Sequence, residues 1–171
     1  MSQSLDLISS NFSDNVIGSI NTKSNLFPQY FSGGGALYIS SSIEQTNITD
    51  CNFDRNYIVG GGGGALYIFS GKNVEINDCN FNYNAAWSSY TVKAQGGAIM
   101  AAGKTSVVLK DSGFNYNQAR PRITNTNPVT YSGEGGAIYL QSSTLNLTHS
   151  NFSNNYVITG QFDSGAGGLF N

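Results

Sequence analysis

Charged residues are scarce in this sequence. They make up 11% of its 171 residues, against about a quarter in an average soluble protein. Eight Lys and Arg and ten Asp and Glu leave a net charge of −2. Such a balance provides no basic surface for nucleic acid or for an anionic membrane. We therefore expect no nucleic-acid partner.

Long hydrophobic runs are also missing. No apolar stretch approaches the ~18 residues of a membrane-spanning helix, so we expect no transmembrane segment. The opening residues, MSQSLDLISSNF, lack the basic and apolar regions of a secretory signal peptide. Repeat sequence reaches both ends, so we interpret residues 1–171 as a single domain that is a segment of a longer repeat protein or a stacking subunit.

The groups that usually carry catalysis are few and scattered. There is one histidine, and none recurs near either of the two cysteines, so a nucleophilic cysteine is not expected. The ten acidic residues are spread thinly, whereas glycoside hydrolysis needs two carboxylates at a set separation. We predict no enzymatic activity, no catalytic residue, no cofactor and no resident metal. A polysaccharide-degrading enzyme stays open as a less favoured alternative.

What the sequence has instead is repetition. The motif [CS]-[NG]-F-x-x-N occurs five times: Ser10–Asn15, Cys51–Asn56, Cys79–Asn84, Ser112–Asn117 and Ser150–Asn155. Between the copies stands a second motif, GGA followed by two mostly apolar residues: Gly34–Tyr38, Gly63–Tyr67, Gly96–Met100 and Gly135–Tyr139. From the Ala of GGA to the next motif Phe is 17, 16, 16 and 15 residues, but from Phe to the next Ala is 24, 12, 17 and 23. One half of each repeat therefore has a nearly fixed length and the other half varies. This pattern is typical of a solenoid with insertions on one edge.

Apolar residues alternate with polar ones before each Phe motif. The matching pairs are Leu5 and Leu7, Thr46 and Ile48, Val74 and Ile76, Val107 and Leu109, and Leu145 and Leu147. Period-two alternation predicts a half-buried strand. We expect about three short strands per repeat, stacked as an all-β parallel β-helix with the Phe side chains in the core and the Asn side chains in turns. The expected Phe and Asn columns are Phe12, Phe53, Phe81, Phe114 and Phe152, and Asn15, Asn56, Asn84, Asn117 and Asn155.

The alternation of GGA[IL] with F-x-x-N resembles the repeats of the chlamydial polymorphic outer membrane proteins and of related surface β-helices of the pectate-lyase-like superfold. The resemblance extends over nearly the whole chain. It implies a single-stranded right-handed parallel β-helix (β-solenoid) of about five coils, located outside the cell or at its surface. It also implies a structural or adhesive role.

Aromatic residues supply the candidate binding surface. If the residue after GGA points inward, the next residues point outward in one column: Tyr38, Tyr67, Met100 and Tyr139. The tyrosines of this column either bind sugar rings or a neighbouring molecule, or are covered by the chain's own loops. The variable segments 16–33, 85–95, 118–134 and 156–166 are expected to be loops along one edge, suited to recognition or to padding. Among their aromatic residues, Trp87 is the strongest candidate for a ligand contact.

Two further columns have two interpretations each. Cys51 and Cys79 stand at equivalent places, where they form either a disulfide or a pair of reduced, inward fillers. The aspartates Asp50, Asp78 and Asp111, followed in the column by His149, are either part of a calcium site or, as we favour, solvated turn residues.

Four Asn-x-Ser/Thr triplets are candidate N-glycosylation sites on outward positions: Asn11, Asn47, Asn146 and Asn151. The outward columns of the alternating strands lack the regular threonines of an ice-binding surface, so we give that function little weight. The favoured prediction is a non-enzymatic structural or adhesive β-helix that self-associates end to end or adjoins further repeats. The alternative is a carbohydrate-binding module.

Overall fold

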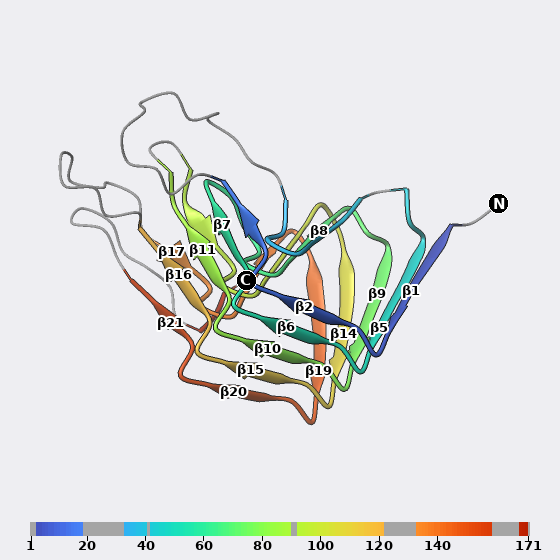
Figure 1. Cartoon of the computed structure of the whole chain (residues 1–171). Helices are drawn as coiled ribbons and strands as arrows, with labels where there is room; N and C mark the ends of the chain where they lie inside the picture. Colours follow the sequence, from blue (N-terminus) through green and yellow to red (C-terminus); the bar gives the residue numbers. More distant parts are fainter. Residues whose placement is uncertain are drawn as a thin grey trace.

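The computed structural model describes residues 3–18, 33–40, 42–89, 92–121, 133–158 and 168–170. Every regular element in these ranges is a β-strand. Within them no helix is long and apolar enough to cross a membrane. The strands wind into five stacked coils, as Figure 1 shows from blue to red, and each coil gives one strand to each of four parallel sheets. The predicted parallel β-helix is therefore confirmed.

The chain passes through the four sheets in the same order in every coil. The first sheet contains β1 (Ser4–Ile8), β5 (Gln45–Thr49), β9 (Asn73–Asn77), β14 (Ser106–Lys110) and β19 (Thr144–Thr148). The second contains β2 (Asn11–Ser13), β6 (Asn52–Asp54), β10 (Asn80–Asn82), β15 (Gly113–Asn115) and β20 (Asn151–Ser153).

The third sheet contains β3 (Val16–Ile17), β7 (Tyr57–Val59), β11 (Ala85–Trp87), β16 (Gln118–Arg120) and β21 (Tyr156–Val157). The fourth contains β4 (Leu37–Ile39), β8 (Leu66–Phe69), β13 (Ile99–Ala102), β18 (Ile138–Gln141) and β22 (Leu169–Phe170). A short extra pair, β12 (Ala94–Gln95) and β17 (Gly133–Glu134), lies before the fourth sheet.

The prediction of about three strands per coil was too low. The Phe motif is itself a strand of the second sheet, and the residues after its Asn form the third sheet. The segments predicted as loops therefore begin with paired strands. Most of the remainder of these segments, with Phe27, Tyr30, Phe31, Tyr90, Tyr131 and Phe162, lies outside the described residues.

Left-handed backbone turns separate the first three sheets. Ser9, Asp50, Asp78, Asp111 and His149 stand between the first and second sheets, and Asp14, Arg55, Tyr83, Tyr116 and Asn154 between the second and third, all with φ between 47° and 57°. Asn, Asp and His adopt this conformation more easily than most other residues with a side chain. Each coil therefore turns at the same two places, which keeps the strands in register.

Equivalent positions of successive coils stack on one another in the core, and the Phe position is identical in all five. Phe53 stacks on Phe81 with ring centroids 4.7 Å apart, and Phe81 stacks on Phe114 at 4.6 Å. All three side chains are fully buried, as are Ile48 and Leu109 of the first sheet. The predicted Phe column is thus the center of the core.

The GGA motif allows neighbouring coils to approach closely. A Cβ atom placed on Gly64 would lie 2.0 Å from the carbonyl oxygen of Gly97, and one on Gly97 would lie 2.0 Å from that of Gly136. Real Cβ atoms do not approach so closely. The first glycines of three motifs, Gly63, Gly96 and Gly135, also have positive φ values, which glycine adopts without strain.

Candidate functional site

The Asn column predicted from the sequence is a continuous hydrogen-bonded ladder. The Asn84 side chain donates to Asn117 Oδ1 at 3.0 Å and to the Phe53 carbonyl oxygen at 2.9 Å. In turn, Asn84 Oδ1 accepts from both the backbone N–H and Nδ2 of Asn56, at 3.0 Å each. The side chain is fully buried and every polar atom has a partner, so this column serves the fold.

The two cysteines are free, buried thiols, so the disulfide alternative is not formed in the structure. The Sγ atoms of Cys51 and Cys79 instead donate to the carbonyl oxygens of Thr49 and Asn77, at 3.3 and 3.1 Å. Burial raises the pKa of Cys79 to about 11. Such a thiol is a poor nucleophile at neutral pH, because the thiolate is the reactive form.

The column after GGA points out of the core as predicted, but most of it is covered. Tyr38 is 45% exposed, whereas Tyr67 and Tyr139 are each 8% exposed and cluster with Met100. Burial raises the pKa of both Tyr67 and Tyr139. The proposed aromatic ladder is therefore accessible at Tyr38 only, and the alternative in which the chain covers its own tyrosines is the one seen.

Part of the cover comes from the segment that precedes the fourth sheet. A Cβ atom placed on Gly62 would lie 2.0 Å from Met100 Sδ, so this backbone lies directly on the Met100 side chain. Beside it, Glu134 Oε1 pairs with Lys93 Nζ at 2.7 Å, and Glu134 Oε2 accepts from Gln95 Nε2 at 2.9 Å. Glu134 and Lys93 also act on the pKa of Tyr139, so these polar groups lie close to that buried tyrosine.

Trp87 does not offer a free ring face. On one side its ring stacks on Tyr57, with centroids 5.4 Å apart. On the other side the Arg120 guanidinium carbon lies 4.3 Å from the ring centroid, a cation–π contact. A sugar that stacked on Trp87 would first have to displace one of these neighbours, so the structure does not support the predicted contact.

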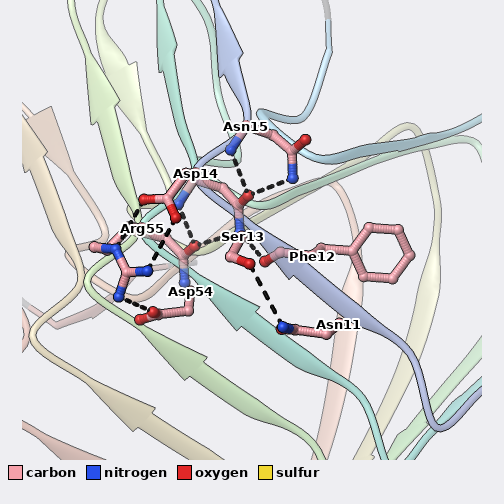
Figure 2. Close-up of polar contacts among 9 residues, drawn as sticks. Asn11, Phe12, Ser13, Asp14, Asn15, Asp54 and Arg55 are labelled. Atoms are coloured by element: carbon pink, nitrogen blue, oxygen red, sulfur yellow. Dashed lines mark hydrogen bonds and ion pairs between the residues drawn. The ribbon is translucent and has the colours of Figure 1, made fainter.

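An exposed column that the sequence analysis did not single out lies at the turn between the second and third sheets. Figure 2 shows its start, where Arg55 bridges the carboxylates of Asp14 and Asp54 while the Phe12 ring points away into the core. Arg55 Nε and Nη2 lie 2.8 and 2.9 Å from the two Asp14 oxygens. The hydrogen bond from Arg55 holds the pKa of Asp14 below its usual value.

The same column continues as a stacked tyrosine pair. The rings of Tyr83 and Tyr116 lie 5.0 Å apart and nearly parallel, and the side chains are 54% and 45% exposed. The two facing surfaces of the rings cover one another, so the pair presents its ring edges and its two outer faces. Aligning the five F-x-x-N copies would have placed Arg55, Tyr83 and Tyr116 in one column, since each precedes the final Asn.

The aspartate column behaves as a set of turn residues. Asp50, Asp78 and Asp111 all have positive φ values, and Asp50 accepts a hydrogen bond from Ser9 Oγ at 2.8 Å. His149 Nδ1 lies 3.7 Å from Asp111 Oδ1. In the part of the chain that the structure describes, no group of three or more His, Cys, Asp or Glu side chains could hold a metal ion.

A groove of about 210 Å³ runs along the outer face of the first sheet. It is lined by Asn47, Thr49, Glu75, Ile76, Asn77, Val108 and Lys110. Glu75 is the one carboxylate in this lining, whereas glycoside hydrolysis ordinarily uses two. The groove is a polar surface without the acid pair of a hydrolase.

The four candidate glycosylation sites lie on outward positions of the first two sheets. Asn11, Asn146 and Asn151 are exposed, while Asn47 is half-buried and donates through Nδ2 to Asp6 Oδ1 at 2.6 Å. Three of the four amides are therefore accessible for modification.

The core is incompletely covered at both ends of the stack. Leu147 in the fifth coil is 40% exposed, whereas Leu109, at the same place in the fourth coil, is fully buried. Phe12 and Phe152 are likewise only partly buried, at opposite ends of the Phe column. We call the open edge of β1, β2 and β3 the first-coil face, and that of β19, β20 and β21 the last-coil face.

Comparison with known proteins agrees with this architecture. The model of the family described as right handed beta helix region matches residues 4–169. No curated protein and no solved structure matches the chain. The family match extends from β1 to β22 and includes every described coil. The chain therefore belongs to the right-handed β-helix family.

Proposed function

We propose that this protein is a non-enzymatic structural or adhesive β-helix of an extracellular or cell-surface assembly, in which another β-structure covers each open end. The observation that carries the proposal is the unfinished core. Leu147 and Phe152 at the last-coil face stand at the places of the buried Leu109 and Phe114, but no described coil follows theirs. Exposed apolar strand edges favour pairing with another strand.

The use of the repeated residues supports a structural role. The Phe column fills the core and the Asn column satisfies the backbone at a turn. The glycines allow close contact between coils. The residues that recur in every coil thus stabilise the stack. The extracellular location is proposed from the resemblance to surface β-helices such as the chlamydial polymorphic outer membrane proteins.

The proposal is tested by the mass of the protein in solution. We expect light scattering after size-exclusion chromatography to show oligomers that lengthen with concentration, and negative-stain images to show short filaments. Leu147→Lys places a charge on the last-coil face and is expected to give monomers. Asn80→Lys places the same charge on the exposed outer side of β10 and is expected to associate like the parent protein.

Two outcomes would count against this proposal. A parent protein that stays monomeric at every concentration would contradict assembly. Equal loss of association in both variants would show that charge alone, and not the open face, is responsible. Far-ultraviolet circular dichroism and thermal melting of each variant would establish that the β-helix is intact.

Carbohydrate binding is a second candidate function. Of the predicted tyrosine contacts, Tyr38 is the one that is exposed. Tyr38 remains exposed, and its ring lies 5.4 Å from that of Tyr67 at an angle of 38°. If this surface binds sugar, Tyr38→Ala abolishes glycan-array binding, whereas Tyr83→Ala, a change on another column, preserves it. An array without signal for the parent protein removes this candidate.

A further inference from the structure

The buried Asn ladder has a direction. In each coil the Asn backbone N–H and Nδ2 donate to Oδ1 of the Asn in the following coil. The pattern starts with Asn15, which donates to Asn56 at 3.1 and 2.8 Å. It ends with Asn155, whose Oδ1 accepts from Asn117 at 3.0 and 2.9 Å. The ladder thus has an acceptor end and a donor end.

Those two ends are complementary to one another. Among the described residues nothing donates to Asn15 Oδ1, and the Asn155 backbone N–H has no acceptor. We propose that a second copy of the chain docks head to tail, so that Asn155 of one copy donates to Asn15 of the next in the register of successive coils. This inference rests on the proposed function and specifies its partner and its polarity.

A second ladder runs in the same direction. The backbone N–H of Cys79 donates to Ser112 Oγ, and that of Ser112 donates to Ser150 Oγ, both at 3.1 Å. Ser150 therefore ends this ladder with a donor, and Ser10 begins the corresponding column with a hydroxyl oxygen. Head-to-tail docking places Ser10 where the next acceptor is needed.

The apolar residues of the two faces also match. Leu5, Leu7, Phe12 and Ile17 are partly buried at the first-coil face, and Leu145, Phe152 and Val157 are partly buried at the last-coil face. In the docked register Phe152 stacks on Phe12 of the next copy. The stacked Phe pairs within the chain, 4.6 to 4.9 Å apart, show the geometry of such a contact.

The charges at the faces permit this contact. Among the six strands of the two faces the only charged residue is Asp6, and none contains Lys, Arg or Pro, the residues that commonly protect exposed edges. Head-to-tail register places Asn146 beside Asp6, on the side away from Asn47. Asn47 Nδ2 already donates to Asp6 within the chain, which shows that an amide fits beside this carboxylate.

Head-to-head docking lacks this complementarity. Two first-coil faces would bring the acceptor Asn15 Oδ1 toward a second acceptor and would place two Asp6 carboxylates in the same interface. Two last-coil faces would oppose donor to donor at Asn155. A head-to-tail contact leaves one face of each kind free, so it propagates into an open filament.

Chemical cross-linking of two variants, each with one added and exposed cysteine, tests the polarity. Asn11→Cys and Asn151→Cys lie on exposed outward positions of β2 and β20, which become neighbours only in head-to-tail docking. One variant carries a size tag, the two are mixed at a concentration where oligomers form, and a short bis-maleimide is added. Asn80→Cys, in the same column at β10, replaces either variant in the control mixtures.

We expect a mixed adduct of the two variants and none from either variant alone, from the control mixtures or from the parent protein, whose two thiols are buried. A double variant with both added cysteines is expected to give a series of dimers, trimers and longer adducts. Oligomers that yield adducts of one variant with itself, or no adduct, overturn head-to-tail docking but leave assembly standing. Failure to form oligomers at any concentration overturns both proposals.

Discussion

The middle coils and the end coils carry the same motifs in different surroundings. Phe81 is fully buried between two other phenylalanine rings, whereas Phe152 stacks on one ring and is partly exposed. Asn84 has partners on both sides in its ladder, whereas Asn15 has a partner on one side only. A solenoid coil is therefore stabilised by its neighbours as much as by its own sequence.

The largest effect is expected from the Phe column. Phe81→Ala removes a fully buried ring and should lower the free energy of unfolding by about 3–5 kcal/mol. Phe152→Ala removes a ring that is already partly exposed, so we expect roughly half that loss. Urea denaturation at a concentration that gives monomers measures both. Equal losses would mean that the two coils are equally well covered, contrary to the comparison.

A smaller difference is expected in the Asn ladder. Asn84→Ala leaves the Phe53 carbonyl oxygen and two neighbouring asparagines without their buried partners, which we expect to cost about 2–4 kcal/mol. Asn15→Ala removes bonds from an exposed end and should cost about 1 kcal/mol or less. The same denaturation series, with exposed Asn80→Ala as a control, tests this. A cost for Asn15→Ala as large as that for Asn84→Ala would contradict it.

The smallest effects are expected from changes of pH. High pH should destabilise a middle coil through Cys79, and low pH should destabilise the first coil through Asp14. The pKa of Cys79 is raised to about 11, so its contribution to stability is present below about 9 and is lost as the pH rises toward 11. The pKa of Asp14 is lowered by Arg55, so its contribution is present at neutral pH and is lost as the pH falls through the folded-state pKa.

Melting temperatures across pH measure these contributions. Cys79→Ser should reduce the fall in melting temperature at alkaline pH and leave the fall at acid pH unchanged. Asp14→Asn should lower the melting temperature slightly at neutral pH and reduce only the fall at acid pH. A variant that changes the melting temperature in the other pH range would show that the assigned group is not the one titrating.

The sequence predicted the parts of the fold that recur with a fixed period. The Phe column, the Asn column and the inward positions after GGA were all placed correctly, because each coil must repeat them to keep its strands paired. The predicted number of strands per coil was too low, because the strands of the third sheet lie in segments of unequal length. A strand as short as Val16–Ile17 gives no periodic signal of its own.

The candidate binding residues were harder to predict, for a physical reason. Alternation gives the direction of a side chain but not what covers it. Tyr67 points outward as expected and is nevertheless buried, because its ring packs against Tyr38 and Phe69 and clusters with Met100. The faces of Trp87 are occupied by Tyr57 and Arg120, which stand in the neighbouring strands β7 and β16 of the third sheet.

Amide hydrogen exchange at several protein concentrations tests most directly whether the open ends are docking faces. At low concentration we expect fast exchange in β1 and β19 and slow exchange in β9, the central strand of the same sheet. Raising the concentration should protect β1 and β19 and leave β9 unchanged. Exchange in β1 and β19 that does not depend on concentration would contradict the account.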